Sequence, residues 1–135
     1  MMSTNRPALS RLHHVAVIAS DYPRSRAFYT DILGLAVIAE THRADRASWK
    51  LDLALPCGAQ LELFSFPAPP PRPTRPEAAG ARHIALAVAD LGAWVDWLTG
   101  QGLTVEPVRR DPLTGARFTF FADPDGLPLE LVETG

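Results

Sequence analysis

Apolar and polar positions follow the same order twice along this chain of 135 residues. Residues 12–21 align with residues 81–90 at an offset of 69, which places His14 opposite His83. Later in each half, Leu61-Glu62-Leu63 aligns with Leu129-Glu130-Leu131 at an offset of 68. Two matching blocks in the same order indicate an internal repeat, and a repeat determines the architecture of a small domain.

Each repeat is predicted to form a strand, a helix and three further strands, which makes the chain an α+β protein of two βαβββ repeats. In the first repeat Asp21 can cap a helix that reaches Leu33, and in the second Asp90 can cap one that closes near Gly100. The predicted strands are residues 12–19, 35–41, 48–55 and 60–66, then 84–88, 103–109, 116–121 and 128–133. Residues 123–126 are predicted to form the turn between the last two strands.

The domain organisation follows from the same pattern. Residues 1–10 are expected to be an N-terminal tail, and residues 11–134 a single domain. Within it, repeat 1 covers about 11–66 and repeat 2 about 81–134. The linker, residues 67–80, holds six of the thirteen prolines and is therefore predicted to be extended and stiff.

Composition narrows the class of protein. The apolar fraction is 47%, the charged fraction is 21% and the formal net charge is −2, which argues against a nucleic-acid partner. No apolar run of 18 residues is present, so we expect no membrane partner. Cys57 is the single cysteine and cannot form an internal disulfide, so a cytoplasmic location is expected.

The candidate chemistry lies where polar side chains interrupt apolar strands. His14 and His83 each share a strand face with small or aliphatic residues, and Glu62 and Glu130 each lie between two leucines. A buried carboxylate is costly unless it neutralises or meets a cation. Two imidazoles and two carboxylates form a ligand set for one divalent ion of Ni, Zn, Mn, Co or Fe. His13 has no counterpart in the repeat and His42 lies in a charged stretch, so both are left out of this set.

The sequence resembles the vicinal oxygen chelate superfamily, which includes glyoxalase I, extradiol dioxygenases and bleomycin resistance proteins. The similarity extends from Leu12 to Glu133, with specific stretches at 14–21, 28–35 and 123–130 and a likeness to a small glyoxalase-like branch. It implies a curved eight-stranded mixed sheet around one metal, held by His14, Glu62, His83 and Glu130. It also implies a homodimer, with the site formed either within one chain or across two.

By its ligand set the chain is most similar to glyoxalase I, a lactoylglutathione lyase, in which one metal-site glutamate moves a proton. Glu130 and Glu62 are equally good candidates for that catalytic residue. The resemblance implies a lyase or isomerase acting on a small molecule with vicinal oxygens. Ile18 and Phe66 stand where that enzyme typically has Arg and Asn, which argues against glutathione as the substrate.

Other recognition groups and other functions stay open. An anionic substrate could be recognised by the cations Arg43, Lys50, Arg109 and Arg117. The alternatives are a non-enzymatic metal-binding or small-molecule-binding protein of the bleomycin resistance type, and an extradiol-type dioxygenase.

Overall fold

The computed structural model describes residues 5–135, and it forms two successive modules of the predicted order. The first contains β1 (His14–Ala19), α1 (Tyr22–Ala27), the π-helical turn η1 (Phe28–Ile32), β2 (Ala36–Arg43), the short 3-10 turn η2 (Ala44–Arg46), β3 (Ser48–Ala54) and β4 (Gln60–Ser65). The second contains β5 (Ile84–Val88), α2 (Leu91–Gly100), β6 (Arg109–Arg110), β7 (Arg117–Ala122) and β8 (Pro128–Glu133). The prediction of two βαβββ repeats in an α+β fold is confirmed.

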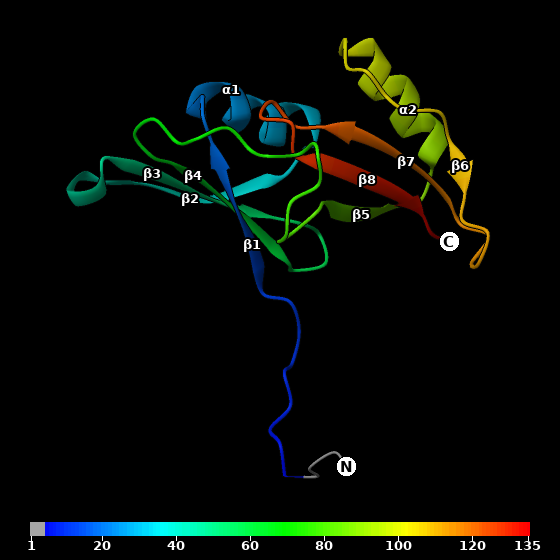
Figure 1. Cartoon of the computed structure of the whole chain (residues 1–135), viewed down its shortest axis with the longest axis horizontal. Helices are drawn as coiled ribbons and strands as arrows, with labels where there is room; N and C mark the ends of the chain where they lie inside the picture. The colour runs from blue at the N-terminus through cyan, green and yellow to red at the C-terminus, as the bar shows by residue number, and fades with distance from the viewer. Residues whose placement is uncertain (1–4) are drawn as a thin grey trace.

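The N-terminal tail is described only in part. Residues 1–4 of the predicted tail over 1–10 lie outside the described residues, and residues 6–13 form neither helix nor strand. Figure 1 shows this stretch running away from the two modules before the chain enters β1.

Both helices begin as their sequences predict. The Asp21 carboxylate accepts a hydrogen bond from the Arg24 backbone N–H, and the Asp90 carboxylate accepts one from Ala93. Each aspartate thereby satisfies one of the N–H groups that a helix start leaves without a partner. In the first module the helical turn continues as η1 until Gly34, whose φ of 74° is readily adopted only by a residue without a Cβ.

The strands form two four-stranded sheets, with the orders β1-β4-β3-β2 and β5-β8-β7-β6. In each sheet the first strand pairs parallel with the last strand of its module, and the other pairs are antiparallel. The eight strands of the described chain are therefore divided between two sheets and do not form one continuous sheet. Because β1 and β5 pair on one side only, each leaves an open edge.

One predicted strand is much shorter than expected. Residues 103–109 were predicted to be a strand, but only Arg109 and Arg110 pair regularly, as β6. Glu106 still contacts β7, since its N–H donates to the Phe120 carbonyl at 2.9 Å and its carbonyl accepts from Thr119 Oγ1 at 2.6 Å. Pro107 follows at once and has no N–H to continue a ladder, which accounts for the interruption.

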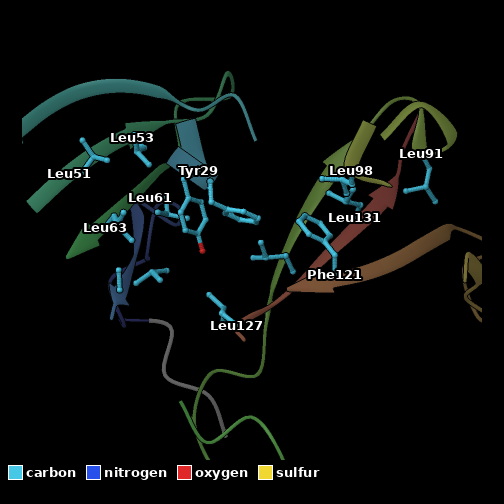
Figure 2. Close-up of a cluster of buried hydrophobic side chains, with 14 residues drawn as sticks. Tyr29, Leu51, Leu53, Leu61, Leu63, Leu91, Leu98, Phe121, Leu127 and Leu131 are labelled. Carbon is cyan, nitrogen blue, oxygen red and sulfur yellow. The ribbon is translucent and has the colours of Figure 1, made fainter. Parts of the chain in front are cut away.

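A single apolar core joins the two modules. Leucines from β3, β4, β8 and α2 gather in one cluster, with Tyr29 and Phe121 between the two sheets (Figure 2). The Tyr29 side chain is fully buried, and its hydroxyl donates to Asp123 Oδ2 of the other module at 2.7 Å. Asp125, in the same turn, accepts hydrogen bonds from the backbone N–H and hydroxyl of Ser20. The predicted turn at 123–126 thus holds the modules together.

The proline-rich segment, residues 67–80, connects β4 to β5 and lies between the two modules in Figure 1. Thr74 Oγ1 donates to the Gly126 carbonyl at 2.9 Å, and Arg72 Nη2 lies 2.9 Å from both the Ala81 and the Arg82 carbonyl oxygens. These contacts fix the segment against the second module, in agreement with a stiff linker. The longest α-helix in the described part of the chain, α2, has ten residues, and none there is long and apolar enough to cross a membrane.

Candidate metal centre

The first half-site consists of His14 and Glu62. His14 begins β1 and shares its outward face with Ala16 and Ile18, whereas Val15, Val17 and Ala19 turn toward the core. Glu62 lies on the neighbouring strand β4, and its Oε2 is 3.4 Å from His14 Nδ1. The glutamate side chain is only 12% exposed, and the imidazole is 42% exposed. A buried carboxylate therefore faces a more open histidine.

The second half-site consists of His83 and Glu130. His83 directly precedes β5, and Glu130 lies on β8, which pairs with β5. His83 Nε2 is 3.1 Å from Glu130 Oε1. The repeat therefore places the same two side-chain types at matching positions of the two sheets, as the aligned sequences predict.

Both pairs have spacings that suit ligation of a metal. Nitrogen and oxygen ligands about 2.1 Å from one ion are about 3.0 Å apart at a right angle and about 3.4 Å apart at a tetrahedral angle. The observed separations of 3.1 and 3.4 Å fall in this range. The Nδ1 atom of His83 is buried without a hydrogen-bond partner, so the ring is anchored on its Nε2 side alone. The donor set fits a divalent ion of the borderline class.

The structure does not bring the two half-sites together. Within residues 5–135, no group of three or more His, Cys, Asp or Glu side chains is arranged to hold a metal ion. One chain thus provides two separate His–Glu pairs on two sheets, and a single four-ligand site stays a prediction.

The surroundings of the two half-sites differ, which the repeat alone could not reveal. Lys50 and Asp52 on β3 lie beside Glu62, with Lys50 Nζ 2.9 Å from Asp52 Oδ1 and 3.8 Å from Glu62 Oε1. The neighbouring Asp52 carboxylate raises the pKa of Lys50 above its usual value, with a smaller contribution from the charge of Glu62. Opposite Glu130 in the register stands Phe120, whose ring meets that of His83 edge-on at 5.1 Å.

Three of the four predicted anion-binding cations lie close to the half-sites. The Arg43 guanidinium lies over Phe64 at 4.9 Å, and that of Arg109 lies over Phe118 at 5.2 Å. Lys50 contacts Glu62, as described above. Arg117 instead pairs with Glu133 at 3.3 Å, outside both half-sites.

The positions that separate this chain from glyoxalase I also face the first half-site region. Ile18 is 53% exposed on the outward face of β1. Phe66 stacks on Phe64 at 6.0 Å, and the Arg43 guanidinium lies 5.8 Å from its ring. An arginine from β2 therefore lies near this face, although β1 itself carries none.

The two histidines left out of the predicted ligand set lie outside both pairs. His13 precedes β1, and its Nδ1 is 3.0 Å from His14 Nδ1, so it contacts the first half-site from the side. His42 is exposed on β2 and packs on Trp49 with ring centroids 4.8 Å apart.

Comparison with known proteins shows the family to which the chain belongs. Residues 11–131 match the model of the Glyoxalase/Bleomycin resistance protein/Dioxygenase superfamily. The uncharacterized protein YwkD of Bacillus subtilis is 58% identical, over 93% of this chain and 98% of its own. A 2-epi-5-epi-valiolone epimerase of Actinomyces sp is 33% identical, over 93% of this chain and 80% of its own. The crystal structure of a glyoxalase family protein from Enterococcus faecalis is 46% identical, covers 91% of this chain and 97% of its own, and superimposes with a TM-score of 0.84.

Proposed function

Since the chain belongs to the glyoxalase/bleomycin resistance protein/dioxygenase superfamily, we propose that it is a metal-dependent lyase or isomerase of the glyoxalase I type. Its substrate would be a small molecule with two neighbouring oxygens, and His14, Glu62, His83 and Glu130 would hold one divalent ion of Ni, Zn, Mn, Co or Fe. The observation that carries the proposal is the repeated His–Glu pair, with N–O separations of 3.4 and 3.1 Å at equivalent places in two sheets.

When bound, the ion acts as a Lewis acid on the two substrate oxygens and increases the acidity of the hydrogen on the adjoining carbon. A carboxylate of the chain would then accept that proton: the C–H bond breaks and an O–H bond forms on the glutamate, which then gives the proton to the neighbouring carbon. The hydroxyl proton passes from the first substrate oxygen to the second, so that the hydroxyl and the carbonyl exchange places. The reaction is balanced, with no oxidant or further reactant.

The different surroundings of the two glutamates support a division of roles. Glu62 contacts both His14 and the Lys50 ammonium, which together hold its carboxylate in place. Glu130 has His83 as its ion-pair partner and the Phe120 ring as its cross-strand neighbour. We therefore assign the proton transfer to Glu130 and a fixed ligand role to Glu62.

We further propose that the complete centre forms in a homodimer, where the first half-site of one copy meets the second half-site of the other. The separation of the two pairs within one chain favours this arrangement. Both histidines also lie on or beside an edge strand, and those strands present small or aliphatic side chains to solvent: Ala16 and Ile18 on β1, and Ala85 and Ala87 on β5. Exposed apolar edges of this kind are typical of contact surfaces.

Metal titration of the purified protein by calorimetry tests the site. We expect one divalent ion per pair of half-sites, and a loss of affinity of at least tenfold in His14→Gln and in His83→Gln. His42→Gln is the matched control because His42 is exposed and packs on Trp49, outside both His–Glu pairs. Equal affinity in all four proteins would refute the site.

Mixing two inactive variants tests whether the site crosses between copies. In a random mixture of His14→Gln and His83→Gln chains, half of the dimers contain one chain of each kind. Each such dimer has one intact intersubunit site and one doubly mutated site, so about a quarter of all sites regain metal affinity and activity. Sites formed within one chain would regain none.

The activity itself is tested with Glu130→Gln and Glu62→Gln. In D2O, followed by NMR, the wild-type protein should exchange the carbon-bound hydrogen of a 2-hydroxyketone probe or isomerise the methylglyoxal–glutathione adduct. Glu130→Gln should abolish both even at a metal concentration high enough to saturate the variant. Bound metal without any exchange in the wild-type protein would refute the reaction and leave the site standing.

An epimerase is the second candidate, favoured by the relative named 2-epi-5-epi-valiolone epimerase. An epimerase removes a proton and returns it to the opposite face of the same carbon, so it needs the same ligands but a second proton donor. Lys50, whose ammonium lies 3.8 Å from Glu62, is a candidate for that donor. Inversion at one carbon without transfer to its neighbour would distinguish this activity.

A further inference from the structure

A cavity of about 490 Å³ opens over the second half-site. His83 and Glu130 line it together with the rings of Phe118 and Phe120, and part of the proline-rich segment lines it as well. Its volume lies within the range of small-molecule sites in proteins. The cavity is therefore lined both by the predicted metal ligands His83 and Glu130 and by the proline-rich segment, which has no role in the proposed chemistry.

The part of the proline-rich segment that lines this cavity is held rigidly. Thr74 is tied to Gly126, and the Arg72 guanidinium is tied to the Ala81 and Arg82 carbonyl groups. The Nε–H of Arg72 is buried and has no hydrogen-bond partner. Because this atom is closed to solvent, it is not counted among the donors that a ligand in the cavity can reach.

Positive charge is in excess around the cavity. Its lining carries four cations, Arg72, Arg75, Arg82 and Arg109, and three carboxylates, Glu77, Glu106 and Glu130.

The three carboxylates do not neutralise all of these cations. Arg109 pairs with Glu106 at 2.9 Å, and the exposed Arg75 pairs loosely with Glu77 at 3.9 Å. Glu130 is directed to His83. Arg82 makes no side-chain hydrogen bond or ion pair within the described part of the chain, so its guanidinium is available.

We infer that this cavity binds an anionic group of the substrate, a carboxylate or a phosphate, through Arg82 and Arg109. The inference rests on the proposed function and names its substrate class: a small hydroxycarbonyl compound with an acidic group beyond its two vicinal oxygens. Guanidinium groups match both acidic groups because their N–H donors form a planar fork. The Phe118 ring beneath Arg109 holds that fork in position.

Calorimetry on the metal-free protein tests the inference separately from the metal chemistry. Dihydroxyacetone phosphate should bind at least tenfold more tightly than dihydroxyacetone, which has the same hydroxycarbonyl group without the charge. Hydroxypyruvate, with a carboxylate in place of the phosphate, shows which acidic group is preferred. Equal affinities for the charged and uncharged probes would overturn the inference.

Substitutions locate the effect. Arg82→Gln and Arg109→Gln should each weaken binding of the charged probe about tenfold and leave the affinity for metal unchanged. Arg110→Gln is the matched control, because Arg110 follows Arg109 on β6 but lies outside the cavity, where it donates to the Gly115 carbonyl. Thermal unfolding of each variant verifies the fold.

The possible failures are distinguishable. Equal loss in the control and the test variants would overturn the inference, because it would show a general charge effect. If Arg82→Gln and Arg109→Gln selectively lose affinity for the charged probe but the protein binds no metal, the result would support the anion site and refute the proposed function.

Discussion

Removing the hydroxyl of Tyr29 tests how the two modules are joined. The Tyr29 side chain is fully buried, and its hydroxyl donates to Asp123 Oδ2 across the module boundary at 2.7 Å. Asp123 Oδ1 accepts from the Asp125 and Leu127 backbone N–H groups, both at 2.9 Å. In Tyr29→Phe, Oδ1 keeps these two donors, but Oδ2 loses the hydroxyl in a buried place.

A hydrogen bond to a charged group contributes about 1.5–3 kcal/mol, and a buried acceptor left without a donor costs about as much as its desolvation. Because Asp123 is 5% exposed, water cannot readily replace the hydroxyl. We therefore expect Tyr29→Phe to lower the free energy of unfolding by about 2–3 kcal/mol.

Tyr22→Phe is the matched control. Its hydroxyl also donates to a carboxylate, Glu40, at 2.5 Å, but Glu40 keeps a second donor in Arg26 and is partly solvated. The control should lose less than about 1 kcal/mol. Urea denaturation followed by tryptophan fluorescence measures both values. A difference of less than about 0.5 kcal/mol between the two variants would show that the hydroxyl of Tyr29 does not hold the modules together.

Three further predictions concern other features. Burial and the Asp123 charge raise the pKa of Tyr29 above its usual value. The contribution of the Tyr29 hydroxyl to folding stability is therefore complete below about pH 10 and declines only as the pH rises further. Absorbance at 295 nm should show that tyrosinate forms at higher pH in the folded than in the urea-unfolded protein. Gly34→Ala should lower the free energy of unfolding by about 1 kcal/mol, because Gly34 has a φ of 74° that alanine adopts only with strain. Gly100→Ala, within α2, should leave the free energy of unfolding unchanged or raise it in the same urea assay. Lys50→Gln should lower kcat several-fold at saturating metal by freeing Glu62, and Lys50→Arg should restore part of it; unchanged kcat in both variants would contradict the role of Lys50.

Much of the fold could be predicted because the local signals were strong and occurred twice. The aspartate caps, the alternation of apolar residues and the turn at 123–126 placed both helices and seven of the eight strands close to their observed positions. The prediction of a strand over 103–109 was wrong because its apolar residues, Leu103 and Val105, pack on the core without pairing regularly with a neighbouring strand. A buried irregular segment shows the same apolar pattern as a buried strand. Pro107 was the signal in the sequence that distinguishes the two.

The candidate site was predictable one half at a time. Each His–Glu pair depends on the parallel pairing of the first and last strand of a module, and the repeat had placed a histidine and a glutamate on or beside those strands in both halves. The cross-strand neighbours could not be predicted with the same ease, because the register that sets Asp52 opposite Glu62 and Phe120 opposite Glu130 depends on the whole sheet. In the proposed homodimer the two pairs would meet through contacts between chains, which no pattern within a module encodes.

The two equivalent glutamates have different neighbours, so the two sides of the proposed centre differ in their charges and would bind a substrate in one orientation. On the first side, Lys50 and Asp52 form an ion pair, with Lys50 Nζ 2.9 Å from Asp52, so their opposite charges already balance each other. On the second side, Phe120 and an arginine-lined cavity leave Arg82 without a partner in residues 5–135. A substrate held by its vicinal oxygens between the two pairs would thus gain more by directing an acidic group toward the second side. The carbon nearest that group would lie beside Glu130, which is the reason for expecting the proton transfer and the recognition of charge on the same side of the centre.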